Sequence, residues 1–203
     1  MPDQETNLTN TELLHVALHA NQQGRTQDAI EALKQILERD ADDAKATYML
    51  GALHAEIGMT DQAVTEMARA VELDPSLVTA HFQLGLLHYM ATRYEDAASA
   101  WEPLDESTEL ECLYLFKSGM LKLVDGQYED GINLIESGIA SNQFNEALNN
   151  DMRGIVERVR GRMSELNVSG AKDEQEAAVM TANSAVRTPD LSAYQSKDDN
   201  QEN

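Results

Sequence analysis

The side chains best suited to chemistry are a pair of histidines and a cysteine. His15 and His19 lie four residues apart, a spacing that places both imidazoles on one face of a helix, where they could hold a metal ion. No third ligand stands near them in the sequence, so we interpret them as polar positions on a helix surface. The only cysteine, Cys112, excludes an intramolecular disulfide and any site with several cysteine ligands. We therefore predict neither a metal nor a cofactor.

Catalytic motifs are missing as well. No glycine-rich phosphate loop, nucleophile elbow or metal-binding motif occurs in the chain. A reactive cysteine needs an electropositive setting, and no basic partner for Cys112 can be identified, so we interpret its thiol as structural. The arginines between residues 153 and 162 could bind an anion, but on a terminal helix they are better explained as a solubilising face. The sequence predicts a protein that is not an enzyme.

Composition and charge narrow the classes of partner. The chain has 203 residues with a net charge of −21, and it is 42% hydrophobic but only 5% aromatic, with four prolines, which favours an all-helical protein. Residues 1–147 carry 26 acidic and 8 basic side chains, a balance of −18 that repels phosphate backbones and argues against nucleic acid. The N-terminus does not resemble a signal peptide, and no apolar run is long enough to insert into a membrane. With the single cysteine, these features predict a cytoplasmic protein.

A sequence pattern of 34 residues repeats along the chain. Reading the sequence in steps of 34 aligns small residues, bulky residues and turn glycines over four units, 10–43, 44–77, 78–111 and 112–145, with no insertion or deletion. The aligned positions are Ala17, Gly51, Gly85 and Gly119; Ala29, Ala63, Ala97 and Gly131; Leu33, Met67, Trp101 and Ile135; and Gly24, Gly58, Thr92 and Gly126. This pattern predicts four helix pairs.

Physical reasons connect the pattern to paired helices. Two antiparallel helices pack closely only where both present a small residue, so Gly51 is expected to face the neighbourhood of Ala63, with bulky residues filling the space beside them. Glycine is suited to the turn because it adopts positive φ at little cost. His54 and His88 occupy equivalent positions, and we interpret both as packing between the two helices of a unit.

The repeated residues resemble the tetratricopeptide-repeat family. In the second unit, Leu50 and Gly51 match the family's Leu-Gly pair, and Ala63, Met67 and Pro75 match the small, bulky and proline positions of its second helix and exit. The resemblance covers about two-thirds of the chain. It implies an all-α fold, a right-handed α-solenoid in which residues 10–145 form four stacked tetratricopeptide units.

The remaining segments are predicted from their own composition. Apolar residues at helical spacing between Leu148 and Met163 predict a capping helix over 146–166. Residues 1–9 are predicted to be a flexible N-terminus, and residues 167–203 a disordered acidic tail. Pro103 should shorten or kink the second helix of the third unit. Gly131 and Gly138 replace alanines expected in the second helix of the fourth unit, which we therefore predict to be the weakest.

The resemblance also implies a binding surface. In the family, the first helix of each repeat lines a concave groove, and the matching positions here are mostly apolar, as expected of an interaction site. The candidate groove residues are Leu14, Leu18, Tyr48, Ala52, Phe82, Leu86, Tyr89, Met90, Phe116, Met120 and Leu123. The family's carboxylate clamp, which holds acidic chaperone tails, is absent, because Leu14, Leu18, Met49, Thr79 and Gln83 stand where its polar and basic residues are needed.

Two functions fit this pattern. The first is a non-catalytic protein-interaction scaffold, an adaptor or chaperone-like protein whose groove holds an apolar or amphipathic segment, with basic flanks favoured by the acidic surroundings. The alternative is a structural subunit of an assembly, whose groove is closed by self-association, as in a homo-oligomer, or by the chain's own tail.

Overall fold

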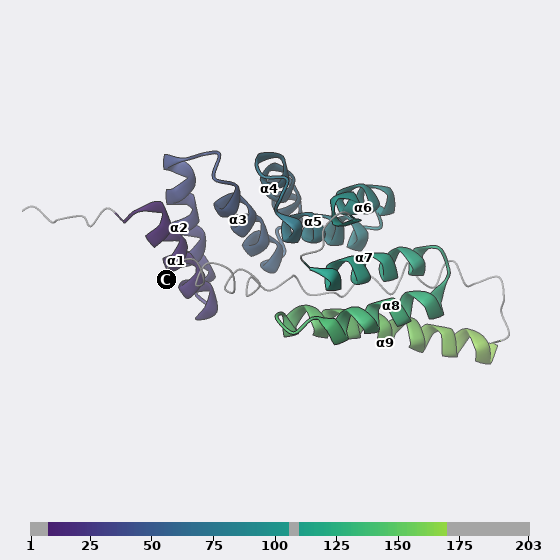
Figure 1. Ribbon diagram of the computed structural model, residues 1–203. Coiled ribbons are helices and arrows are strands. Elements are labelled where there is room, and N and C mark those ends of the chain that lie inside the picture. The colour runs from purple at the N-terminus through teal and green to yellow at the C-terminus, as the bar shows by residue number, and fades with distance from the viewer. Residues whose placement is uncertain (1–7, 106–109, 170–203) are drawn as a thin grey trace, which may run out of the picture. The chain divides into compact units, whose positions relative to one another are not determined.

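The computed structural model describes residues 8–105 and 110–169, and every regular element in those ranges is a helix (Figure 1). The expected disordered tail therefore lies almost wholly outside the described residues, as do residues 1–7 of the N-terminus. The helices are α1 (Asn10–Gln22), α2 (Thr26–Arg39), α3 (Ala44–Glu56), α4 (Thr60–Leu73), α5 (Val78–Met90), α6 (Tyr94–Trp101), the 3-10 helix η1 (Glu102–Asp105), α7 (Glu111–Val124), α8 (Tyr128–Ser141) and α9 (Glu146–Ser169).

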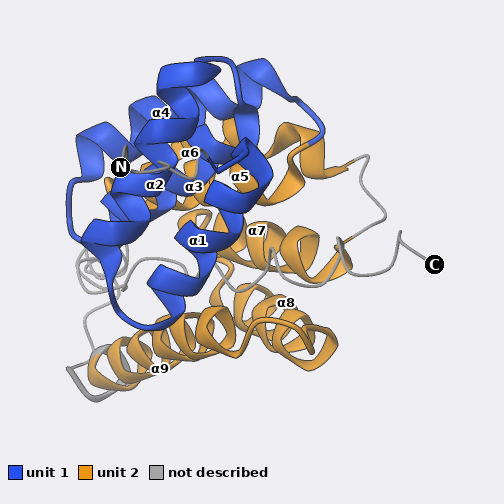
Figure 2. Ribbon diagram, turned by 90° about the vertical axis from the view of Figure 1, so that its left-hand side faces the viewer, with its two compact units in different colours: residues 1–76 blue, residues 77–203 orange. Residues whose placement is uncertain are grey.

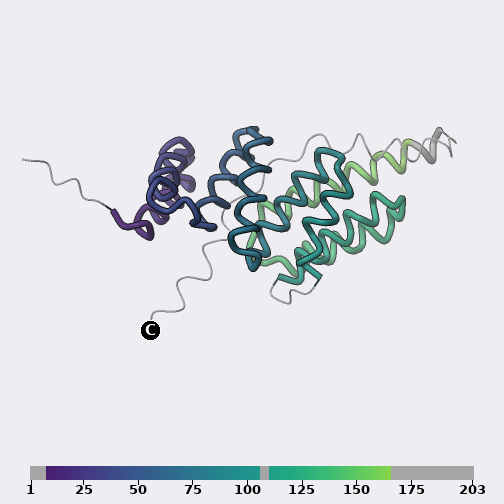
Figure 3. The backbone as a smooth tube through the Cα atoms, turned by 90° about the horizontal axis from the view of Figure 1, so that it is seen from above, coloured from purple at the N-terminus to yellow at the C-terminus, as the bar shows by residue number. Residues whose placement is uncertain are grey.

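The helices fall into two compact units, residues 1–76 and residues 77–203 (Figure 2). In the first unit, α1 packs against α2 and α3 against α4. In the second, α5 packs against α6 and α7 against α8, while α9 lies beside α8 (Figures 1 and 3). Each of the four expected repeats therefore contains one pair of neighbouring helices, and the helix expected over 146–166 runs three residues further, to Ser169.

The chain enters its first helix through a capping box. Glu12 N–H donates to Thr9 Oγ1 at 3.3 Å, and Thr9 N–H donates to Glu12 Oε2 at 2.7 Å, so two amides that the helix leaves unpaired are satisfied reciprocally. The hydrogen bond from the Thr9 backbone lowers the pKa of the Glu12 carboxyl. Thr9, which we expected to be part of a flexible terminus, thus caps the start of α1.

The turns inside the helix pairs share one backbone geometry at the aligned positions. Gly24, Gly58 and Gly126 have positive φ angles of 69°, 81° and 74°, and Thr92, the residue aligned with them, has a φ of 59°. A β-branched residue in the left-handed region is strained, because its side chain crowds the backbone. The third repeat (residues 78–111) therefore keeps the turn geometry of the other repeats, although its residue at this position is less suited to it.

We expect Thr92→Gly to stabilise the protein. Glycine removes the steric cost of a positive φ, about 1–2 kcal/mol for an ordinary residue, and part of that gain is offset by the greater entropy of glycine in the unfolded chain. The free energy of unfolding, measured by urea denaturation, should rise by about 0.5–1 kcal/mol. The reverse change in an equivalent turn, Gly58→Thr, should lower it by a similar amount. An unchanged or lower value for Thr92→Gly would contradict the strain assigned to this turn.

Gly131 and Gly138 of α8 allow close helix packing, a role that the sequence analysis did not predict. A Cβ on Gly131 would lie 2.8 Å from the Gly119 carbonyl oxygen, and one on Gly138 would lie 2.6 Å from the Phe116 ring. Alanine at either position would force neighbouring atoms apart, because real Cβ contacts are longer than this. Both glycines thus allow α7 and α8 to pack closely, and their intrinsic cost to the helix is not the whole of their effect on stability.

Pro103 shortens its helix as expected. Helix α6 ends after eight residues at Trp101, and the chain continues as η1, whereas α8 has 14 residues. The buried side chain of Lys117 stabilises this irregular end, because its ammonium donates to the Trp101 carbonyl at 3.2 Å and contacts Asp105 Oδ1 at 2.6 Å. A lysine on α7 therefore caps the helix that the proline interrupts.

Candidate protein-interaction surface

Most of the predicted groove residues are buried. Three side chains are half-buried, Leu14, Leu18 and Met90. The other eight are buried, Tyr48, Ala52, Phe82, Leu86, Tyr89, Phe116, Met120 and Leu123. We expected open positions along a groove, and in the described chain these eight belong to the core. Their part in holding a partner stays a prediction.

In the second unit the predicted anchors pack against one another. The ring centroid of Phe82 lies 6.1 Å from that of Trp101 and 6.2 Å from that of Phe116, and the ring of Tyr89 lies 6.0 Å from that of Trp101. The Trp101 indole N–H donates to the Phe82 carbonyl at 2.9 Å. Trp101 was not among our site candidates, although its alignment with Leu33 and Met67 marked it as a bulky packing position. These rings account for much of the interior of this unit.

The histidines of the second and third repeats are packing residues with different surroundings. His54 Nδ1 lies 2.6 Å from Glu66 Oε2, which links α3 to α4 in the first unit. Burial raises the pKa of Glu66, although the hydrogen bond with His54 acts in the opposite direction. At the equivalent position of the third repeat, burial lowers the pKa of His88, and the positive charge of Arg93 adds to that shift.

The structure gives the candidate chemical groups no reactive setting. Cys112 is buried, and burial raises the pKa of its thiol, so the nucleophilic thiolate is disfavoured. His19 Nε2 lies 2.8 Å from the side-chain nitrogen of Gln23, and His15 is exposed. Within residues 8–105 and 110–169, no group of three or more histidine, cysteine or acidic side chains is placed to hold a metal ion.

One predicted stripe remains open to solvent. Leu14 and Leu18 lie one turn apart on α1 and are half-buried, while Leu13 and Ala17 turn inward as buried residues. Asn21 continues the stripe, and its Oδ1 atom is buried without a hydrogen-bond partner in the part of the chain that the structure describes. Val16 lies on another face of α1 and is exposed. The stripe thus offers two half-exposed apolar side chains.

Other exposed apolar side chains were not predicted as contact positions. Besides Val16, these are Ile57, Met59, Tyr114 and Phe144, and Phe144 is the most exposed of them. Ile57 and Met59 flank the turn glycine of the second repeat, and Phe144 lies between α8 and α9. The repeat pattern could not indicate them, because they fall in turns or on outward faces where the 34-residue period makes no demand for an apolar residue.

The comparisons with known proteins agree with the helix pairs. Residues 20–87 match the family model described as a tetratricopeptide repeat. A crystal structure of the protein MamA has a TM-score of 0.56 to this chain at 22% sequence identity, over 65% of this chain and 77% of that one. A second MamA crystal structure has a TM-score of 0.55 at 18% identity, over 85% of this chain and 91% of that one. None of the curated proteins matches the chain.

A third structure, of a MamA RS-1 double mutant, has a TM-score of 0.56 at 17% identity and covers 85% of this chain. With identities this low, these structures support the fold alone. The repeat alignment, the turn geometry and the match to residues 20–87 together confirm an all-α repeat fold that contains tetratricopeptide repeats. It therefore falls in the class of protein–protein interaction scaffolds. None of the described helices is long and apolar enough to cross a membrane.

Proposed function

We propose that the protein is a non-catalytic, cytoplasmic adaptor that holds an amphipathic segment of a partner protein on α1. The observation that carries the proposal is the half-open stripe of Leu14 and Leu18 on α1. Apolar side chains of the segment would pack on the two leucines.

Charge favours a partner segment with basic flanks. Residues 8–76 carry twelve acidic and five basic side chains, a balance of −7, so the unit that contains α1 attracts positive charge. Electrostatic complementarity of this kind speeds association and selects among partners more than it adds affinity. In a chaperone-like role, the bound segment would belong to a partner protein that has not yet joined the complex in which it functions.

The leucine stripe can be tested with paired variants of the full chain. Affinity purification from the source cells with wild-type protein identifies the enriched partner, and calorimetry with that purified partner then gives the affinity. We expect Leu14→Ser combined with Leu18→Ser to weaken binding at least about tenfold, since central apolar contacts dominate such interfaces. Circular dichroism should show unchanged helicity, because both side chains are already half-exposed.

Val16→Ser is the matched control, since it removes an exposed apolar side chain from another face of the same helix. It should leave the affinity unchanged. Equal binding by wild-type protein and the double leucine variant would exclude α1 as the contact surface. Salt should slow association without abolishing the complex, because the apolar contact does not depend on ionic strength.

A further inference from the structure

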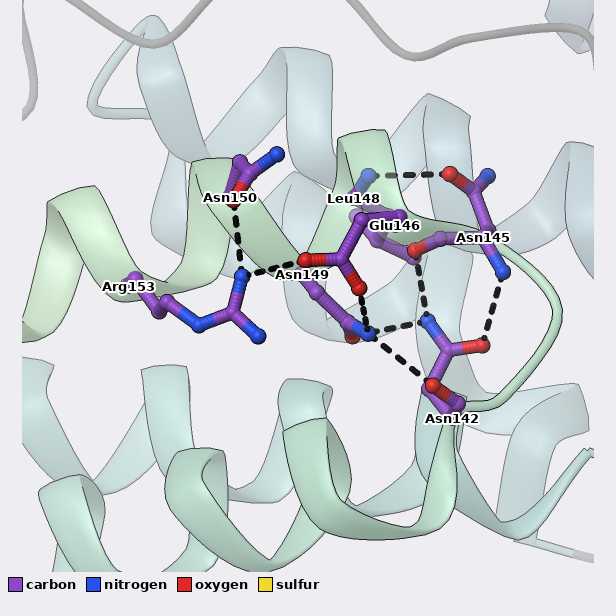
Figure 4. Close-up of polar contacts among 7 residues, drawn as sticks. All are labelled: Asn142, Asn145, Glu146, Leu148, Asn149, Asn150 and Arg153. Atoms are coloured by element: carbon purple, nitrogen blue, oxygen red, sulfur yellow. Dashed lines mark hydrogen bonds and ion pairs between the residues drawn. The ribbon is translucent and has the colours of Figure 1, made fainter.

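The connection between α8 and α9 is held by three buried asparagines (Figure 4). Asn142 Oδ1 accepts hydrogen bonds from the backbone N–H groups of Phe144 at 3.3 Å and Asn145 at 3.2 Å. Asn142 Nδ2 donates to the Asn145 carbonyl at 3.1 Å and to Asn149 Oδ1 at 2.9 Å. Asn149 Nδ2 donates back to the Asn142 carbonyl at 2.9 Å. The backbone of this four-residue connection is therefore fixed from both ends.

The network also sets the start of α9. Asn145 Oδ1 accepts from the Leu148 backbone N–H at 2.9 Å, which satisfies one of the amides left unpaired at a helix N-terminus. Buried polar networks with every member paired are rigid and define a single arrangement. The cap and the connection thus form one stiff structure.

This stiff connection presents an exposed aromatic ring. Phe144 is 69% exposed, although its own backbone is bound by the buried Asn142 side chain. A free phenylalanine in a flexible loop would lose conformational freedom on binding, whereas a ring on a fixed backbone has already lost much of it. The geometry is that of a preorganised apolar contact.

The surroundings of Phe144 differ in charge from the rest of the protein. Residues 137–145 contain no charged side chain, although the whole chain has a net charge of −21. Extending the segment through residue 163 adds four arginines and three carboxylates, a balance of +1. Arg153 Nη1 lies 2.8 Å from Glu146 Oε1, and this hydrogen bond lowers the pKa of Glu146, so the two charges offset each other beside the connection.

We propose that this surface is a contact between two copies of the chain. We define the Phe144 surface as the Phe144 ring together with the exposed uncharged residues that precede it in the sequence, Ser137, Ala140, Ser141 and Gln143. Two molecules of charge −21 repel each other, and the repulsion is smallest where uncharged surfaces meet. A basic partner, by contrast, would gain more from the acidic surfaces elsewhere on the molecule.

The geometry points to a symmetric and weak dimer. In a twofold contact the same surface is used by both molecules, so each Phe144 ring packs against the equivalent surface of the other copy. A surface built around one ring is small, which places the dimer in the class of interfaces below about 1,200 Å² in total. This contact lies in the second unit and does not depend on the proposed binding of a partner to α1.

Sedimentation equilibrium of the full chain tests the proposal directly. We expect concentration-dependent dimers of the wild-type protein, and a dissociation constant at least about tenfold higher for Phe144→Ser. Phe144→Leu should retain most of the association, because an apolar side chain is kept. Raising the salt to about 0.5 M should leave the dimer unchanged or strengthen it, since salt screens the repulsion between acidic copies.

Ile57→Ser is the matched control, because it removes another exposed apolar side chain and should leave dimerisation unchanged. Thermal unfolding should be the same for all three variants at low concentration, which shows that each is folded. A wild-type protein that stays monomeric up to about 1 mM would overturn the proposal. So would a Phe144→Ser variant that dimerises as well as wild type, or a dimer that dissociates in salt.

Discussion

Gly119→Ala should destabilise the protein by about 3 kcal/mol, at the upper end of what overpacking usually costs. A Cβ at this position would lie 2.6 Å from Ile135 Cγ1 and 2.7 Å from the Gly131 carbonyl oxygen. The Ile135 side chain could shift in part, but the carbonyl belongs to the backbone of α8 and cannot move without separating the two helices. The free energy of unfolding by guanidinium, followed by circular dichroism, gives the loss.

The matched control is the same substitution in an open part of α9. A Cβ on Gly161 would meet nothing within 4 Å, so Gly161→Ala removes a helix-destabilising glycine without a clash. We expect it to raise the free energy of unfolding by up to about 1 kcal/mol. Opposite signs for the two variants would identify close packing as the cause. If Gly119→Ala is also neutral or stabilising, α7 and α8 are not in the close contact described.

The repeat period predicted the helix pairs and their turns because it reflects local requirements. A small residue on each helix and a positive φ in each turn are needed within a single pair, so they recur every 34 residues and can be read directly. Thr92 shows how strong this signal is, since its φ of 59° follows from its alignment with glycines and not from its own residue type. Pro103 was equally local, because it acts on the helix that contains it.

The 34-residue period could not predict that the groove residues are buried. The period states that Phe82 and Phe116 occupy equivalent positions, but it does not state which rings approach them. Phe82 packs against Trp101 of its own repeat, and it also meets Phe116 of the next repeat. The family resemblance implied that these positions line a concave surface. In this protein, Phe82 and Phe116 are instead buried in the core of residues 77–169.

The glycines in the second helix of the fourth repeat show where intrinsic helix propensity fails to predict the effect of a substitution. Taken alone, Gly131 and Gly138 each weaken a helix by about 1 kcal/mol relative to alanine. The contacts reverse that conclusion for substitutions, since there is no room for a methyl group at either position. The asparagines around Phe144 were equally unpredictable, because their hydrogen bonds depend on the path of the chain between α8 and α9.

Trp101→Ala should have the largest effect among substitutions that create a cavity. The side chain is fully buried, its ring lies against those of Phe82 and Tyr89, and its indole N–H satisfies the Phe82 carbonyl. Gly85 lies so close that an added Cβ would clash with the indole nitrogen, so the space around the ring is shaped for tryptophan. Removing a large buried aromatic typically costs about 3–5 kcal/mol.

Trp101→Phe should fall between wild type and Trp101→Ala, because it keeps an aromatic ring but loses the indole hydrogen bond to the Phe82 carbonyl. Tyr114→Ala is the control, since it removes an exposed aromatic from the same unit and should cost less than about 1 kcal/mol. Hydrogen exchange locates the damage: protection in Trp101→Ala should fall most in α5, α6 and α7, which contact this ring or carry its neighbours. Uniform loss over the nine α-helices of the described residues, or no loss in α5, would contradict the assignment of Trp101 as the centre of the core of residues 77–169.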